Sequence, residues 1–266
     1  MLWSTSSVVH LTRCHLPSDG RYAAYIVCFR IRILRSNFHS GFLSVDIISS
    51  SDAFTESRRS KDPSAATSFG ALLFDVARNQ VVVGARDAIF RLSLKGLSLL
   101  ERAAWPALPS KVSLCQMKGQ SESACHNFVR VLASNGSQLL ACGTSAYSPE
   151  CSWRQMENIG HIVSNESGIA KCPYAPDANV TALMVNEGRL FVATHIDFSG
   201  ADPAIVRTLG SAPPLRTNIH DSRWLDDPQF VGSFQTEHFV YFLFREVAVE
   251  YINCGKVIAR AQCCSS

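Results

Sequence analysis

The sequence of 266 residues predicts an all-β protein that forms part of a β-propeller. Three observations lead to this fold class. From residue 68 onward, short apolar segments rich in β-branched and aromatic residues alternate with turn residues. A similar segment returns at a nearly constant interval, and periodic helical stretches are few, with residues 221–225 fitting one short turn. The chain is 47% hydrophobic and 18% charged, so it has enough apolar residues for a sizeable core.

The expected strands are short and are separated by polar turns. Along residues 88–94, apolar and polar residues alternate with a period of two over the second half of the segment, which is typical of a strand. In chain order, the expected strands are Ala71–Phe74, Gln80–Ala85, Ala88–Leu94, Phe128–Leu132, Leu139–Thr144, Thr181–Val185, Arg189–Thr194 and Phe239–Arg245.

The repeat decides between propeller and sandwich. An apolar run that ends in a small residue returns at Ala85, Thr144 and Thr194, and a matching strand ends near Phe244, giving intervals of 59, 50 and 50 residues. Repeats of about 40–50 residues with several strands each are typical of propeller blades. The chain supplies about three blades and the start of a fourth, whereas propellers close with about four to eight. Either the chain is a piece of a longer propeller, or the repeat is not that of a propeller.

We place residues 1–46 outside the domain, as a disordered leader or a wrongly assigned exon, and residues 47–266 inside it. The segment Tyr22–Phe29 has the length of a signal-peptide core, but it lies late in the chain. Arginines at 30, 32 and 35 follow it instead of a cleavage site. No apolar run approaches the roughly 18 residues that a membrane-spanning helix needs.

Ten cysteines and three glycosylation sequons favour an oxidising, extracytoplasmic setting. No two cysteines form a Cys-x-x-Cys pair, so a zinc ribbon or a thioredoxin-like site is not expected. Cys115 and Cys125 stand ten residues apart, and Cys142 and Cys151 nine. A cytosolic protein with buried thiols is the alternative. The three sequons begin at Asn135, Asn165 and Asn179.

The formal net charge of +3 arises in the first 61 residues, and the rest of the chain is nearly neutral. We therefore expect no nucleic-acid partner, since no basic face is indicated. An enzyme is the rival class, because His195 lies near Asp197 and His220 precedes Asp221. Adjacent residues of a strand point to opposite faces, however, and no nucleophile, metal or phosphate-binding motif accompanies either pair. We expect neither catalysis nor a cofactor.

Several ordered motifs carry a family resemblance. The most specific is Cys-Gly-Thr-Ser-Ala-Tyr-Ser-Pro at residues 142–149, and Asn-Cys-Gly-Lys stands at residues 253–256. Together they resemble the N-terminal half of the Sema domain of semaphorins, in particular those of class 5, over about residues 47–260. The further segments that carry the resemblance are 79–94, 115–132, 172–176, 197–205, 215–217, 224–231 and 241–246.

This resemblance implies a seven-bladed propeller at the cell surface, which binds a plexin receptor and guides axon or cell migration. It also implies dimerisation, which would let one ligand engage two receptors. Disulfides Cys115–Cys125 and Cys142–Cys151 are implied as well, and we add Cys172–Cys254 as a hypothesis. The remaining blades, the cysteine-rich module and any membrane anchor of the family would lie outside this chain.

The contact residues for a receptor are not evident from the sequence. A polar and aromatic cluster is of the kind found at interface hot spots, although a tryptophan followed by leucine is more often a core residue. Plexins also have Sema domains, so a receptor ectodomain is an alternative to a ligand, and a propeller-fold enzyme is a more remote one. The cluster consists of Arg216, Asp221, Arg223 and Trp224.

Overall fold

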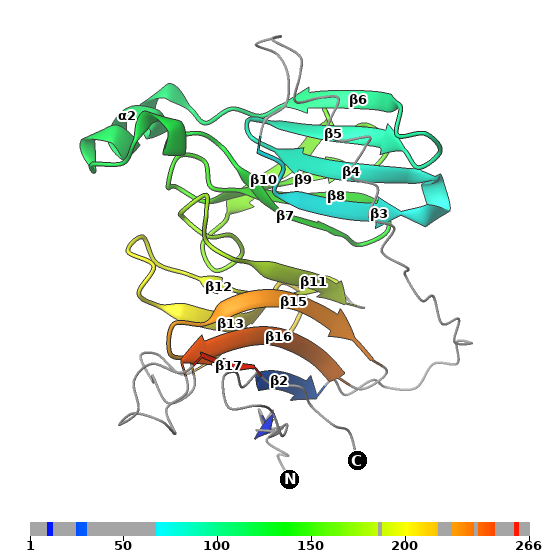
Figure 1. Cartoon of the computed structure of the whole chain (residues 1–266). Coiled ribbons are helices and arrows are strands. Elements are labelled where there is room, and N and C mark those ends of the chain that lie inside the picture. Colours follow the sequence, from blue (N-terminus) through cyan, green and yellow to red (C-terminus); the bar gives the residue numbers. More distant parts are fainter. Residues whose placement is uncertain are drawn as a thin grey trace.

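Four antiparallel sheets make up the part of the chain that the structure describes (Figure 1). This computed structural model describes the backbone of residues 10–12, 25–30, 68–185, 188–217, 225–236, 239–247 and 258–260, and the side chains of those ranges from residue 68 to residue 247. Within the described residues, no helix is long and apolar enough to cross a membrane.

Each of the first three sheets is built from four strands that follow one another in the chain. The first sheet contains β3 (Ala71–Asp75), β4 (Gln80–Ala85), β5 (Ala88–Ser93) and β6 (Leu99–Ala104). The second contains β7 (Val129–Ser134), β8 (Gln138–Gly143), β9 (Glu150–Gln155) and β10 (Ile162–Ser167). The third contains β11 (Thr181–Val185), β12 (Arg189–His195), β13 (Pro203–Thr208) and β14 (Leu215–Arg216).

The fourth sheet pairs distant segments of the chain. Strands β15 (Gln229–Gln235) and β16 (Phe239–Val247) form a hairpin, and β2 (Tyr25–Arg30) and β17 (Ile258–Arg260) both pair with β16. Strand β1 (His10–Thr12) pairs with β2. Thus two strands lie in residues 1–46, which the sequence analysis places outside the domain. Ile26, Val27 and Phe29 are good strand formers, and β16 provides the partner that gives them a sheet. The domain boundary at residue 47 stays a prediction.

The sheets are stacked in chain order, and each contacts the next through one edge strand: β3, β7, β11 or β15. Strand β7 packs against β3 and β4, β11 against β7, and β15 against β11. The repeated segment of the sequence is the strand that pairs with each of these edge strands, namely β4, β8, β12 and β16. The sheets thus lie side by side, as the blades of a propeller do. This arrangement confirms the propeller-type fold and the partial set of blades.

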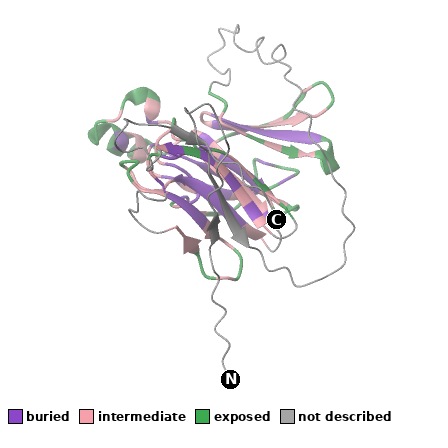
Figure 2. Cartoon of the chain, turned by 60° about the horizontal axis from the view of Figure 1, so that its bottom comes forward, coloured by how far each residue is buried: buried purple, intermediate pink, exposed green. Residues whose placement is uncertain are grey.

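The inner strands of the second sheet, β7 and β8, are packed on both faces, which explains why they are largely apolar. Along β8, Leu139 and Ala141 face the first sheet and pack with Ile89, whereas Leu140 and Cys142 face the third sheet and pack with Leu190. In Figure 2 the buried residues accordingly lie along the strands, whereas α2 and several turns are exposed. Burial of both faces at roughly 25 cal/mol per Å² is the main source of stability between sheets.

Polar contacts also join the first two sheets. The carboxylate of Glu101 on β6 accepts hydrogen bonds from Ile159 N (3.1 Å) and Gly160 N (2.9 Å), in the turn after β9. Arg154 is 1% exposed and donates to Ile159 O (2.8 Å), with its guanidinium 4.8 Å from the ring of Trp105. Burial lowers the pKa of Arg154 to about 10, although Glu101 works in the opposite direction.

One helix was not expected from the sequence. Helix α2 (Pro109–Met117) lies between β6 and β7 and projects from one side of the molecule (Figure 1). Pro109 stands in its first turn, where a missing amide hydrogen costs nothing. Leu108, Leu114 and Met117 are exposed rather than packed on a core, so the helix lacks the apolar stripe by which helices are usually found.

Candidate functional site

The chain turns sharply after β8, at the segment that carries the most specific motif. Ser145, Ala146 and Tyr147 have φ angles of 42°, 55° and 58°, so three successive non-glycine residues are left-handed. A bulky residue rarely adopts this conformation, which costs about 1–3 kcal/mol and often marks a functional site. The surrounding structure must therefore hold the turn in place.

A buried asparagine holds this turn. Asn127 is fully buried, its Oδ1 accepts a hydrogen bond from Ser145 N (3.0 Å), and its Nδ2 donates to Trp105 O (2.8 Å). Gly143 is required beneath it, because a Cβ atom there would overlap the Asn127 side chain. The Cys-Gly-Thr motif thus has a steric reason: the glycine makes room for the amide that fixes the turn.

Helix α2 is fastened to the same turn. Lys111 Nζ donates to Ser145 Oγ (3.2 Å) and to Glu150 Oε2 (2.9 Å). The disulfide between Cys115 and Cys125 packs against Ala146 in a small buried cluster. Consequently the helix, the disulfide and the strained turn form one unit.

Three aromatic rings gather beside this unit. The ring of Phe198 lies 5.5 Å from that of Tyr147 and 6.2 Å from that of Tyr174, between ring centres. Lys118 Nζ, at the end of α2, lies 4.9 Å from the centre of the Phe198 ring. The rings come from the β8–β9 turn, the β10–β11 loop and the β12–β13 loop, which meet only in the folded chain.

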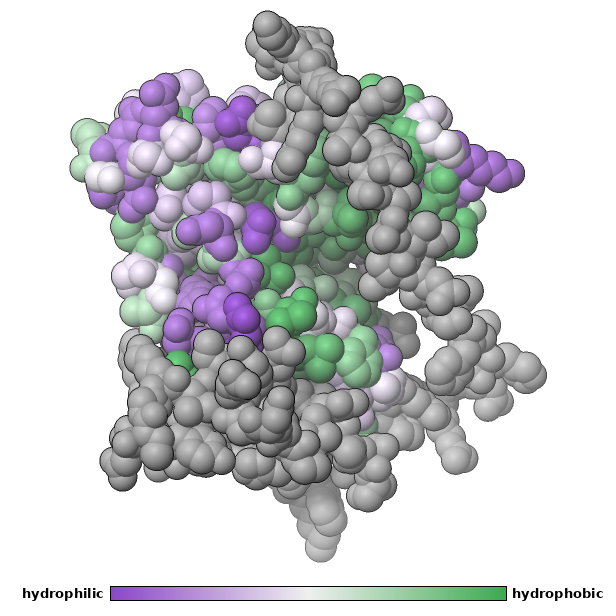
Figure 3. All heavy atoms as spheres, viewed as in Figure 1, coloured by the Kyte–Doolittle hydropathy of each residue, from purple (hydrophilic) through white to green (hydrophobic). Residues whose placement is uncertain are grey.

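These residues border a groove formed by two adjoining hollows of about 380 Å³ and 450 Å³, which share Gln120, Tyr147 and Asp177. We call it the loop-face groove, because its walls come from the loops on the side of the sheets that carries α2. In Figure 3 hydrophilic residues gather on that side of the molecule. The hollow of about 380 Å³ is lined by, among others, Tyr147, Tyr174, Asp177, Asn179, His195, Asp197, Phe198 and Gln229.

The groove's acidic residues have different roles. Asp197 accepts hydrogen bonds from the backbone N–H groups of Ser199 (3.0 Å) and Asp202 (2.7 Å) within its own loop. Partial burial alone would raise the pKa of Asp197, but these hydrogen bonds lower it below its ordinary value. Burial raises the pKa of Tyr147, and the nearby carboxylate of Asp177 raises it further.

Asp197 is therefore engaged in shaping a loop, which does not favour the His195–Asp197 pair as a base and its orienting acid. Among the described residues, no three His, Cys, Asp or Glu side chains come together as a metal site. An aromatic, partly polar surface of this kind is suited to recognition by contact.

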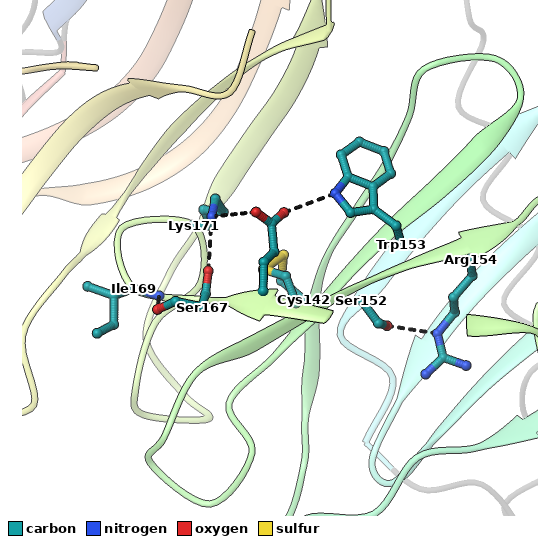
Figure 4. Close-up of a disulfide and its surroundings, with 9 residues drawn as sticks. Cys142, Ser152, Trp153, Arg154, Ser167, Ile169 and Lys171 are labelled. Atoms are coloured by element: carbon teal, nitrogen blue, oxygen red, sulfur yellow. Dashed lines mark hydrogen bonds and ion pairs between the residues drawn. A yellow bond between two sulfur atoms is a disulfide. The ribbon is translucent and has the colours of Figure 1, made fainter. Parts of the chain in front are cut away.

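The structure contains both short disulfides. The Cys115–Cys125 bond closes the loop after α2, and the Cys142–Cys151 bond links β8 to β9 within the second sheet. Trp153 and Arg154 are successive residues of β9 and therefore face opposite sides of the sheet (Figure 4). Lys171 lies on the side of Trp153, near Cys142. Lys171 Nζ and Trp153 Nε1 both contact the Glu166 carboxylate, each at 3.1 Å.

Cys172 is a free thiol in the structure. It is fully buried beside the Cys142–Cys151 disulfide, Leu190 and Val192. Cys254 lies outside the described residues, so the Cys172–Cys254 bond stays a prediction.

All three sequon asparagines are exposed. Asn135 stands in the β7–β8 turn, where its Oδ1 accepts a hydrogen bond from Gln138 N (2.8 Å), and Asn165 lies on the outer strand β10. Asn179 precedes β11 and lines the loop-face groove.

The polar and aromatic cluster expected from the sequence is only partly described. Arg216 Nη2 contacts Asp202 Oδ1 at 2.9 Å, so its charge is paired locally. Asp221, Arg223 and Trp224 lie outside the described residues, as does His220.

The sequence did not predict that Tyr147, Tyr174 and Phe198 meet in the groove with Lys118 at its edge. Each stands in a motif that carries the resemblance, which was an available signal. Their meeting depends on how three loops are placed, and this is a tertiary property.

The chain is similar in sequence and in structure to known semaphorins. No family model matches it. Semaphorin 5c of Drosophila melanogaster is 53% identical over 214 residues, which are 79% of this chain and 19% of the relative. Semaphorin-5B of Mus musculus is 47% identical over 190 residues, which are 71% of this chain and 17% of the relative. The chain thus spans about a fifth of the length of these relatives.

Solved structures agree with this result. Drosophila Semaphorin 2a matches with a TM-score of 0.67 at 35% identity, covering 72% of this chain and 35% of that one. A structure of Drosophila Plexin A in complex with Semaphorin 1b matches with a TM-score of 0.64, also at 35% identity, covering 72% of this chain and 36% of that one. The propeller-type stacking of the sheets and the identity to class 5 members show that this chain belongs to the semaphorin family and carries part of a Sema domain.

Proposed function

We propose that this chain is part of an extracellular guidance ligand, which binds a plexin-type receptor and thereby steers axon or cell migration. The observation that carries the proposal is the match to a semaphorin-family structure solved together with a plexin. The high identity is to semaphorins themselves, which favours a ligand over a receptor ectodomain. A homodimer stays a prediction.

We further propose that the receptor contacts the loop-face groove. Its three aromatic rings and the lysine at its edge have the composition of interface hot spots, in which aromatic and cationic side chains predominate. The disulfide-linked helix and the strained turn beside it favour a preorganised surface, which loses little conformational entropy on binding.

Binding of the full chain to a plexin ectodomain tests this proposal. Lys118 is exposed, so Lys118→Glu should leave the fold intact and weaken binding about tenfold through lost charge complementarity at the groove. Lys95→Glu is the matched control. Lys95 is also exposed, but it lies in the turn between β5 and β6 of the first sheet, away from the loops that form the groove. Equal affinity of all three proteins would exclude the groove, and absence of binding would exclude the plexin partner.

The setting of the protein is also a proposal. Two disulfides and three exposed sequons support passage through the secretory pathway. Secreted protein should therefore lose mass on enzymatic removal of N-glycans. Unmodified asparagine at Asn135, Asn165 and Asn179 would contradict an extracellular or cell-surface location.

A further inference from the structure

The sequon at Asn179 differs from the other two in its surroundings. Asn135 and the strained turn at Tyr147 lie at opposite ends of β8, about 20 Å apart at the rise of a strand. Asn165 lies on β10, the outermost strand of the second sheet. Only Asn179, among these three, lines the loop-face groove.

The acceptor nitrogen of Asn179 is directed across the groove. Its Nδ2 donates a hydrogen bond to Gln229 Oε1 (2.7 Å), which belongs to the first strand of the fourth sheet and lines the same hollow. A substituent on Nδ2 would therefore start inside the groove. Asn179 O also accepts a hydrogen bond from Thr194 Oγ1 (3.4 Å), which limits how far the residue can turn away.

The groove offers chemistry that suits a sugar. Aromatic rings such as those of Tyr174 and Phe198 provide apolar faces for the C–H groups of a pyranose, while Asp177, His195 and Gln229 provide partners for its hydroxyl and amide groups. A hollow of about 380 Å³ has room for the beginning of a glycan, with the rest outside.

We propose that Asn179 bears an N-linked glycan whose first sugars lie in the loop-face groove, and that this glycan lowers the affinity for a protein partner there. Its transfer forms a bond from Nδ2 to C1 of the sugar and breaks the C1–O bond to a lipid diphosphate donor. The lipid diphosphate leaves, and one amide proton passes to solvent. The remaining amide hydrogen can still donate to Gln229. The effect on affinity rests on the proposed function.

Two substitutions at Thr181 separate the glycan from the local structure. Thr181→Val removes the sequon but retains Asn179, whereas Thr181→Ser retains the sequon and the hydroxyl that contacts Ser233 Oγ (2.8 Å). Ser137→Ala removes the Asn135 sequon and controls for loss of a glycan elsewhere. All are made in the full chain and secreted from cells that glycosylate.

Three measurements decide the proposal. Peptide mass analysis should find a glycan at Asn179 in the wild type and in Thr181→Ser, and none in Thr181→Val. Backbone hydrogen exchange in residues 197–202 should be slower with the glycan than without it. Thr181→Val should bind a plexin ectodomain several-fold more tightly than wild type, and Ser137→Ala should bind as wild type does.

An unmodified Asn179, or equal exchange in residues 197–202 with and without the glycan, would overturn the proposed placement. If the glycan is present but Thr181→Val and wild type bind equally well, its effect on the partner is excluded. If no variant binds plexin although exchange differs, the proposed receptor is wrong while the placement of the glycan stands.

Discussion

At the scale of single residues, Gly143 shows how one missing side chain shapes the site. Any Cβ atom there would displace Asn127, whose amide bonds both Ser145 N and Trp105 O. We expect Gly143→Ala to lower the free energy of unfolding by about 2–3 kcal/mol, through overpacking and loss of these buried bonds. Urea denaturation measures the change.

Gly232 provides the matched control for this substitution. It also lies in a strand, but a Cβ atom there would meet nothing within 4 Å. Gly232→Ala should therefore change stability by less than about 0.5 kcal/mol. Similar losses for both variants would show that strand glycine in general, rather than the space for Asn127, is responsible.

As the free thiol of the structure, Cys172 gives a prediction of pH dependence, which a Cys172–Cys254 disulfide would abolish. Complete burial raises the pKa of this thiol far above its ordinary value, against the smaller effect of Arg130. Below the pKa of the unfolded thiol, near 8.5, both states are protonated and the residue adds no pH dependence. Above it, only the unfolded state ionises, so stability falls by up to about 1.4 kcal/mol per pH unit.

Replacing the thiol isolates this effect. The difference in free energy of unfolding between wild type and Cys172→Ala should shrink as the pH rises from 8 to 10. A constant difference would contradict a buried, protonated thiol. A non-reducing peptide map then tests the predicted Cys172–Cys254 bond directly, since a free thiol at both positions would exclude it.

At the scale of elements, the sequence predicts best where a strand is a nearly continuous apolar run. The expected strands 80–85 and 181–185 coincide with β4 and β11; β8 differs by one residue at each end and β12 by one residue at its C-terminal end. The outer strand β10 was missed, because nearly all its residues are exposed and no apolar run marks it. Helix α2 was missed for the same reason.

Of the candidate site, too, one part could be predicted from the sequence and another could not. The pairs Cys115–Cys125 and Cys142–Cys151 are implied by the resemblance to the Sema domain, whose motifs contain these cysteines, and the structure contains both bonds. The groove could not be predicted, since Tyr147, Tyr174 and Phe198 approach one another only after the second and third sheets have been stacked.

The unit of α2 and its disulfide gives a prediction at this scale. In the double variant Cys115→Ala, Cys125→Ala, the ten-residue loop loses its covalent closure, which should cost about 2–3 kcal/mol in the chain-entropy model. Since Lys118, at the end of this helix, lies over the ring of Phe198 at the edge of the groove, plexin binding should weaken as well. Thermal unfolding and the binding assay measure the two effects, and a variant with lowered Tm but unchanged affinity would separate the helix from the receptor surface.

At the scale of the whole molecule, the second sheet is what couples its two neighbours. Leu139 and Leu140 are adjacent on β8 and both fully buried, yet the first packs with the first sheet and the second with the third. Replacing either by Ala should cost about 2–5 kcal/mol, because each leaves a cavity between sheets. The stability losses are therefore similar, but the places where they act differ.

Native-state hydrogen exchange distinguishes these places. Leu139→Ala should speed exchange mainly in β4 and β5, which share the cluster of Val82 and Ile89, and Leu140→Ala mainly in β12, which carries Leu190 and Val192. If the sheets open as separate units held by side-chain packing, each variant should leave the far sheet nearly unchanged. The same increase across all sheets for both variants would show instead that the stacked sheets unfold as one cooperative unit, in which the position of the cavity no longer matters.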